Sequence, residues 1–317
     1  MDPTQFLRRS GVLLVAGKGG VGKSVTTATI GVLAARIGLK VLVVELEGRP
    51  EVPFSLGIEG PLQSEPTVLT EHENGGRLTV QRIRPDDALV EWLRARSLGA
   101  FVKRLRSTGA LELVSFAIPG IREVLVLGKL KSIETEGRYD LIVVDAPATG
   151  HAMTLLTSPA GLAAAARGGP VRRIADEVVE LLGDPARCRV LLVTLPRELA
   201  VDETIESAYE VEDRAGVMLS DVVVNQYVAP EPALAVPLHA DQVASYDPEL
   251  RHALEAARCF ERDRQDAEAR EVTRLADTLP LSLLTMPCLQ GGQLGPDQIE
   301  LLADALERSI TDVVEPL

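Results

Sequence analysis

The chain has 317 residues, of which 46% are hydrophobic and 3% aromatic, and its net charge is −13. This composition provides for a substantial buried core, in one large α/β domain or two ordinary ones. Nucleic acid binding needs a basic stripe or aromatic stacking platforms, and the composition argues against both, so we expect no nucleic acid partner.

The sequence favours a cytoplasmic protein. The first ten residues do not form a secretory signal, and no stretch approaches 18 uncharged apolar residues, so no membrane span is expected. Three cysteines, Cys188, Cys259 and Cys288, lie far apart and form no CxxC pair, which predicts reduced thiols packed as small hydrophobic residues and no zinc site.

Short runs of β-branched and other apolar residues alternate with helical patterns along the chain. Most of these runs are continuously apolar, which is typical of strands covered by helices on both faces. They predict an α/β fold with a doubly wound, mostly parallel sheet. The runs are Val12–Ala16, Val41–Val44, Leu78–Ile83, Leu141–Val144, Val190–Thr194, Val222–Val224 and Leu281–Thr285.

Two segments interrupt this alternation, at about 86–136 and 153–182, and we interpret them as helical insertions in a single domain spanning residues 1–317. The run Ile121–Leu127 in the first insertion is apolar nearly all round. Such a helix is buried in a core or dimer interface, or is covered by a client protein. A further helix is predicted at Asp297–Arg308 from its apolar spacing.

The stretch Gly17-x4-Gly22-Lys23-Ser24 matches the phosphate-loop pattern and lies between a predicted strand and a predicted helix. Its glycines let backbone N–H groups converge on phosphate, and the helix N-terminus adds partial positive charge. Lys23 is expected to bridge the β- and γ-phosphates of ATP, and the Ser24 hydroxyl to bind Mg²⁺. The predicted nucleotide-binding residues of this loop are Gly17, Gly19, Gly20, Val21, Gly22, Lys23, Ser24 and Val25.

Phosphoryl transfer to water also needs carboxylates, and two predicted strands end in them. Glu45 and Glu47 follow the second strand and point the same way on an extended segment, so either is a candidate to position the attacking water. Asp145 ends the apolar run Leu141–Val144 and is the candidate acid that holds Mg²⁺ through water.

The second lysine of the loop, Lys18, resembles the extra lysine of the ParA/MinD/ArsA branch of P-loop proteins. In that branch this lysine reaches across a dimer interface to the partner's phosphates. The resemblance implies that Lys18 is catalytic and that the chain works as a dimer. The alternative is an exposed surface lysine.

Later motifs make the whole chain similar to the ArsA/tail-anchored-protein-targeting ATPase family. The stretch Asp145-Ala146-Pro147-Ala148-Thr149-Gly150-His151 resembles the second switch of that family, and Leu195–Glu203 resembles the segment after its fifth strand. By the same resemblance, Asn225, Gln226 and Pro287 are expected at the adenine. ATP is favoured over GTP because Asn225 lacks the following Lys-x-Asp of guanine readers.

Three departures narrow the resemblance to the single-P-loop bacterial subgroup described as anion-transporting ATPases. The first switch of the family reads D-P-A-H, whereas this chain has Glu47-Gly48-Arg49-Pro50, with Glu47 at the catalytic position. The zinc-binding CxxC of the eukaryotic members is absent, and there is one P-loop where the arsenite-pump ATPases have two.

The predicted function is that of a dimeric ATPase, homomeric or heteromeric, that uses nucleotide-driven dimer closure to act on a partner, client or membrane protein. The alternative is a weakly or non-hydrolysing regulatory subunit of a heterodimer, which the unusual first switch keeps open. A role in chromosome or division-site positioning, as in ParA/MinD proteins, would need a basic face or a basic amphipathic tail, and this sequence shows neither. An iron–sulfur reductase would need two cysteines at a dimer axis, and the three cysteines of this chain are not placed for that.

Overall fold

One eight-stranded sheet organises the chain in the computed structural model, which describes residues 1–46, 50–94, 119–238, 245–289 and 294–313. The strand order is β3-β4-β2-β5-β1-β6-β7-β8, and every neighbouring pair is parallel except β3 and β4. The predicted doubly wound, mostly parallel sheet is confirmed. The strands are β1 (Val12–Ala16), β2 (Lys40–Glu45), β3 (Thr67–Glu71), β4 (Arg77–Arg82), β5 (Leu141–Asp145), β6 (Cys188–Thr194), β7 (Leu219–Tyr227) and β8 (Leu283–Pro287).

Each of the seven apolar runs singled out in the sequence overlaps a strand of this sheet, although the run Leu281–Thr285 begins two residues before β8. The eighth strand, β3, was not predicted. It is an antiparallel edge strand whose residues are mostly exposed, so its sequence lacks the apolar run that marks a covered strand.

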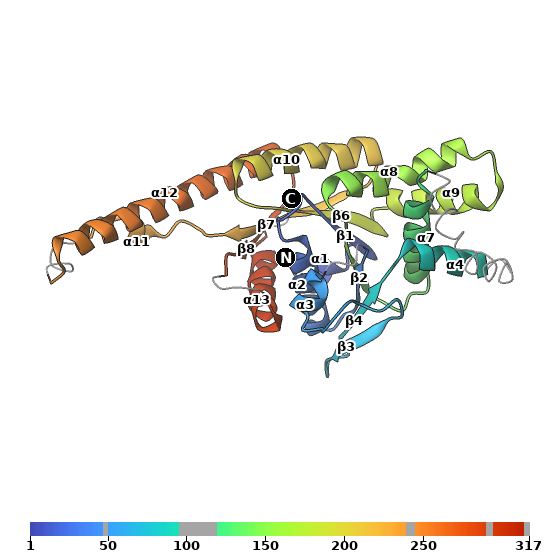
Figure 1. Ribbon diagram of the computed structural model, residues 1–317, viewed down its shortest axis with the longest axis horizontal. Coiled ribbons are helices and arrows are strands. Elements are labelled where there is room, and N and C mark those ends of the chain that lie inside the picture. The colour runs from blue at the N-terminus through green and yellow to red at the C-terminus, as the bar shows by residue number, and fades with distance from the viewer. Residues whose placement is uncertain (47–49, 95–118, 239–244, 290–293, 314–317) are drawn as a thin grey trace.

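The sheet separates two hydrophobic clusters, and side-chain alternation assigns strand residues to them. The helices that cover the two faces of the sheet are seen in Figure 1. Leu13 and Val15 of β1 face the first cluster, whereas Leu14 faces the second. The helices of the first cluster are α1 (Pro3–Leu7), α2 (Lys23–Arg36), α3 (Glu51–Ser55) and α13 (Pro296–Asp312). The second cluster contains α4 (Pro85–Arg94), α7 (Ile121–Thr135), α8 (Thr149–Ala165), α9 (Gly169–Gly183), α10 (Glu198–Tyr209) with its π-helical extension (Glu210–Ala215), and the end of α12 (Pro248–Thr278).

The two segments interpreted as insertions are helical where the structure describes them. The first contains α4 and α7, with residues 95–118 outside the described part, and the second contains α8 and α9. In the run Ile121–Leu127, Val124, Leu125 and Leu127 are buried in the core of the chain itself. Core packing therefore accounts for this apolar helix.

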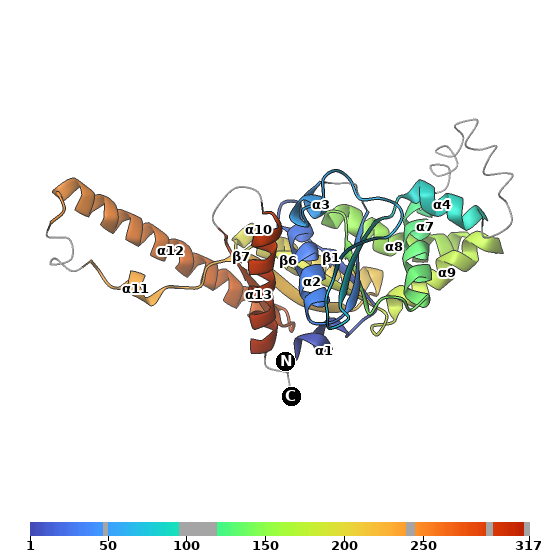
Figure 2. The same cartoon turned by 90° about the horizontal axis from the view of Figure 1, so that it is seen from below.

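The helix α12 has 31 residues and projects from the body beside the short helix α11 (Pro232–Ala235), as Figure 2 shows. Asp247 caps its N-terminus by accepting from the Leu250 N–H, and Pro248 occupies the first turn. Arg258 pairs with Glu255, and Arg264 pairs with Glu261 and Glu268, each about one turn away along the helix. These ion pairs stabilise the part of the helix that makes few contacts with the core. Its outer half and the preceding segment expose Val236, Leu238, Tyr246, Leu250, Leu254 and Phe260.

Candidate nucleotide site

The phosphate-loop motif connects β1, which lies between β5 and β6, to the first turn of α2. Gly17 has φ +152°, and a Cβ there would lie 2.4 Å from the Val193 carbonyl oxygen. Gly22, which precedes the helix, has φ +96°. Both positions require glycine, so the loop keeps its backbone close to β6 and directs the N-terminus of α2 to the carboxyl edge of the sheet.

Lys23 is the first residue of α2, and its side chain lies beneath the loop. Only 6% of the residue is exposed, and its ammonium nitrogen donates to the Lys18 carbonyl oxygen at 3.0 Å. A buried ammonium group beside a helix N-terminus makes this the most favourable position for an anion in the loop. The geometry fits the predicted phosphate-binding lysine.

Ser24 and Asp145 meet at the same edge of the sheet. The Ser24 hydroxyl donates to Asp145 Oδ2 at 2.8 Å, and Asp145 is 7% exposed at the end of β5. Mg²⁺ prefers oxygen ligands and keeps several waters, so it needs only one or two protein oxygens besides the phosphates. A hydroxyl and a buried carboxylate in contact fit that requirement. Among the described residues there is no cluster of three or more His, Cys, Asp or Glu side chains that could hold a metal ion by themselves.

The turn after Asp145 is attached to the loop through backbone hydrogen bonds. The Ala146 N–H donates to the Val15 carbonyl at 3.1 Å, and the Thr149 N–H donates to the Gly17 carbonyl at 3.2 Å. Thr149 is the first residue of α8. The predicted second switch is thus in direct contact with the phosphate loop, a link that no spacing in the sequence reveals.

The predicted adenine residues Asn225 and Gln226 lie near the end of β7 and also contact the loop. The Asn225 side-chain amide donates to the Val21 carbonyl at 2.9 Å and accepts from the Gln226 N–H at 2.9 Å. Gln226 has φ +58°, the one positive φ outside glycine among the described residues. This strained residue lies in β7, at the shift in register with β8 between Val224 and Tyr227.

Pro287 ends β8 and is the register partner of Tyr227 in β7. Both residues line an open groove of about 660 Å³ along the sheet edge, together with Cys288. The structure therefore places Pro287 one strand from Gln226. Val25, in the first turn of α2, packs half-buried against the first cluster.

Lys18 projects from the exposed side of the loop. Gly19 and Gly20 beside it are exposed, and the Lys18 ammonium lies 3.4 Å from Glu203 Oε1 on α10. Sequence reasoning did not identify this pair, although Glu203 belongs to a motif that the resemblance singled out. No periodicity in the sequence places α10 beside the loop.

Of the two acidic candidates after the second strand, Glu45 is the last residue of β2 and is 1% exposed. Glu47 lies outside the described residues. The predicted role of Glu47 in positioning water therefore stays a prediction.

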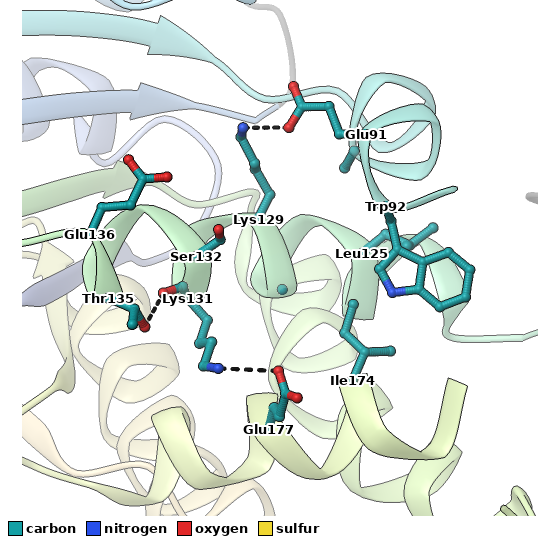
Figure 3. A pocket seen from close by; sticks show the side chains of 12 residues that line it. Glu91, Trp92, Leu125, Lys129, Lys131, Ser132, Thr135, Glu136, Ile174 and Glu177 are labelled. Carbon is teal, nitrogen blue, oxygen red and sulfur yellow. Dashed lines mark hydrogen bonds and ion pairs between the residues drawn. The ribbon is translucent and has the colours of Figure 1, made fainter. Parts of the chain in front are cut away.

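A separate pocket of about 450 Å³ lies between α4, α7 and α9, and none of the predicted site residues lines it (Figure 3). Lys129 pairs with Glu91 and Lys131 pairs with Glu177, the latter at 3.1 Å, so two ion pairs link α7 to α4 and to α9. Trp92 and Ile174 form its apolar side.

Within the described part of the chain, no helix combines the length and apolarity that crossing a bilayer requires. The three cysteines form no disulfide with one another. The expectation that all three are packed as small hydrophobic residues is wrong for Cys288, which is exposed, whereas Cys188 is buried.

Comparison with known proteins supports the interpretation of the loop. The sequence profile of the family described as Anion-transporting ATPase matches residues 10–167, which contain the phosphate loop and Asp145. The ATPase BagA of Mycobacterium tuberculosis is 36% identical over 232 residues, which cover 70% of this chain and 67% of that relative.

Two further relatives match over smaller shares of their length. The Arsenical pump-driving ATPase of Escherichia coli is 30% identical over 217 residues, covering 65% of this chain and 33% of that protein. The ATPase ASNA1 homolog 1 of Paramecium tetraurelia is 28% identical over 148 residues, covering 46% of this chain and 43% of the relative.

Proposed function

Because this chain belongs to the ArsA family of anion-transporting ATPases, we propose that it binds ATP with Mg²⁺ at the phosphate loop and hydrolyses the nucleotide as a dimer. Closure of the dimer on ATP would then act on a partner or client protein. The contact of Ser24 with Asp145 beneath the loop, beside the buried Lys23, is the observation that carries this proposal.

Each residue of the site has a defined task in this proposal. The loop N–H groups and Lys23 bind the phosphates, and Ser24 and Asp145 hold Mg²⁺, Asp145 acting through water. When bound, the metal neutralises charge on the β- and γ-phosphates. Asn225 keeps the loop in its binding conformation through the Val21 carbonyl, and Gln226 and Pro287 lie on the side proposed for adenine.

A dimer is proposed because Lys18 projects away from its own loop, towards Glu203. The exposed Gly19 and Gly20 leave the phosphates open to a second chain, whose own Lys18 would stabilise the charge that develops in the transition state. We propose a cytoplasmic location, where ATP is available and unpaired thiols such as these stay reduced.

A regulatory, weakly hydrolysing subunit of a heterodimer is the second candidate. The first switch, Glu47-Gly48-Arg49-Pro50, favours this candidate. Glu47 replaces the aspartate of the family's D-P-A-H switch, and its side chain is one methylene longer, which would slow hydrolysis. In this case the chain binds ATP and closes on a homologous partner chain, but the partner supplies most of the turnover.

ATP hydrolysis with Mg²⁺, measured across protein concentration, tests these proposals. A specific activity that rises with concentration and is lost in both Lys18→Ala and Lys23→Ala supports the dimeric ATPase. ATP binding without turnover at any concentration supports the regulatory subunit. Lys40→Ala, an exposed lysine at the start of β2, is the matched control and should keep full activity.

A further inference from the structure

We infer that Glu45, the last residue of β2, is a second acidic positioning residue of the magnesium site, where it holds metal-bound water beside Asp145. This inference rests on the proposed function and deepens it. The phosphate-loop motif assigns no role to Glu45, and the sequence offered Glu45 and Glu47 only as alternatives for positioning the attacking water, not for holding metal-bound water.

The strand register brings the two carboxylates together. Glu45 of β2 pairs with Asp145 of β5 in a parallel register. Neighbouring strands lie about 4.8 Å apart, and paired residues of parallel strands project from the same face of the sheet. Val41 and Val43 of β2, and Leu141 and Val143 of β5, all belong to the cluster that packs against α2. Glu45 and Asp145 continue this alternation, so both project towards α2.

The helix that carries Ser24 covers this same face at close range. A Cβ on Gly31 of α2 would lie 2.5 Å from Val43 Cγ2, two residues before Glu45. Ser24, in the first turn of α2, donates to Asp145 at 2.8 Å. Glu45 is therefore on the face and at the edge of the sheet where Ser24 and Asp145 meet.

Burial makes a cation at this position favourable. Glu45 is 1% exposed and Asp145 7% exposed, and two buried carboxylates on adjacent strands repel each other and lose hydration. Lys23 supplies one positive charge at the same edge of the sheet. A divalent ion supplies two more, and its remaining waters donate to carboxylates that do not bind the metal directly.

Arg82 offers a competing explanation that the experiment has to separate. In the register of β2 with β4, Glu45 also pairs with Arg82, which projects from the same face. If Glu45 served only to neutralise this guanidinium, its loss would lower the stability of the fold and leave metal binding unchanged.

The test compares nucleotide binding by the full-length wild-type chain and Glu45→Gln, with a fluorescent ATP analogue, in EDTA and across a Mg²⁺ titration. Removing an acid that holds metal-bound water typically lowers metal affinity by about 10- to 100-fold. We expect Glu45→Gln to need about tenfold more Mg²⁺, and to bind metal-free nucleotide as tightly as wild type or more tightly, because a negative charge near the phosphates is gone. Glu45→Asp should restore part of the Mg²⁺ affinity.

Two further variants separate this role from a structural one. Asp140 immediately precedes the N-terminal end of β5, far from Asp145, and accepts from the Lys40 N–H at 2.8 Å. Asp140→Asn should therefore lower stability without changing the Mg²⁺ requirement. If Glu45→Gln does not fold, the double variant Glu45→Gln/Arg82→Gln keeps the local charge balance and undergoes the same titration.

An unchanged Mg²⁺ requirement in a folded Glu45 variant that binds nucleotide overturns this inference alone. A wild-type chain that binds no nucleotide, with or without metal, overturns the proposed function and the inference together.

Discussion

The ammonium group of Lys18 lies 3.4 Å from Glu203 Oε1, so this lysine of the phosphate loop pairs with α10 of its own chain. In the proposed dimer, Lys18 has to leave this partner in order to reach the phosphates of the second chain. The pair is partly exposed, and such ion pairs contribute about 0.2–1 kcal/mol.

A homodimer breaks one such pair in each chain, about 2 kcal/mol at most, so we expect Glu203→Gln to lower the protein concentration that gives half-maximal ATP hydrolysis by up to about 30-fold. Glu206→Gln, on an exposed position one turn further along α10, is the control and should leave this concentration unchanged. A Glu203→Gln variant as inactive as Lys18→Ala would instead show that Glu203 supports the active state.

The contact between Gly22 and Asn225 predicts a measurable coupling between the loop and β7. A Cβ at Gly22 would lie 2.1 Å from the Asn225 amide nitrogen, and the φ of +96° is strained for alanine. Gly22→Ala should therefore destabilise the fold by about 2–4 kcal/mol, combining about 1–2 kcal/mol of backbone strain with overpacking.

A double-mutant cycle in urea unfolding checks this coupling. Asn225→Ala should relieve the overpacking, so that the double variant is more stable than the sum of the single changes predicts, by about 1 kcal/mol or more. Gly20→Ala, with φ +84° and no atom within 4 Å of its Cβ, is the control that carries backbone strain alone. Additive effects of Gly22→Ala and Asn225→Ala would contradict the contact.

The three thiols should differ in their reactivity. Burial raises the pKa of Cys188 to about 12, so this thiol is protonated at pH 8 as well as inaccessible. Cys288 is exposed and lines the groove beside Pro287. With a thiol reagent at pH 8, we expect Cys288 to react at once and Cys188 only after unfolding.

Peptide mapping of the labelled chain assigns the order of reaction, and Cys288→Ser removes the fast phase as a control. Fast labelling of Cys188 in the native chain would show that β6 is not buried as described. Protection of Cys288 when an ATP analogue is added would further support an adenine position near Pro287.

Much of the fold could be predicted because the central strands are covered on both faces. The run Val12–Ala16 has no exposed face, so its apolar character alone marks it as a strand. The edge strand β3 carries no such signal, because its residues are mostly exposed. The helix α12 was missed for a related reason: with mostly exposed residues and few core contacts, it has no apolar stripe, and its ion pairs and N-cap support it instead.

The candidate site could be predicted where it is contiguous in the chain. The loop from Gly17 to Ser24 is predicted from its phosphate-loop motif alone, and the metal-binding role of Asp145 is predicted from its position at the end of an apolar run. The contact of Lys18 with Glu203 and the pairing of Glu45 with Asp145 depend on strand order and register, which bring distant segments together. One sequence contains no direct measure of that register.

The buried carboxyl group of Asp221 predicts a pH dependence of stability. Its pKa is raised by burial, which outweighs the hydrogen bond from Ser220 and the nearby charge of Arg9. A pKa above that of the unfolded chain means that folding favours the protonated group. The associated stability is present at pH values below the unfolded pKa, about 4, and is lost as pH rises through the folded pKa.

Asp221→Asn keeps the shape of this side chain without an ionisable group, so we expect it to be more stable than wild type at pH 7.5. The difference in the free energy of unfolding should shrink as the pH is lowered towards 4.5, where more of the wild-type carboxyl group is protonated. Urea unfolding across this pH range measures it, with Asp277→Asn on an exposed position of α12 as the control that should show little difference. A variant that is less stable at pH 7.5 would show that the pair with Arg9 outweighs the cost of burial.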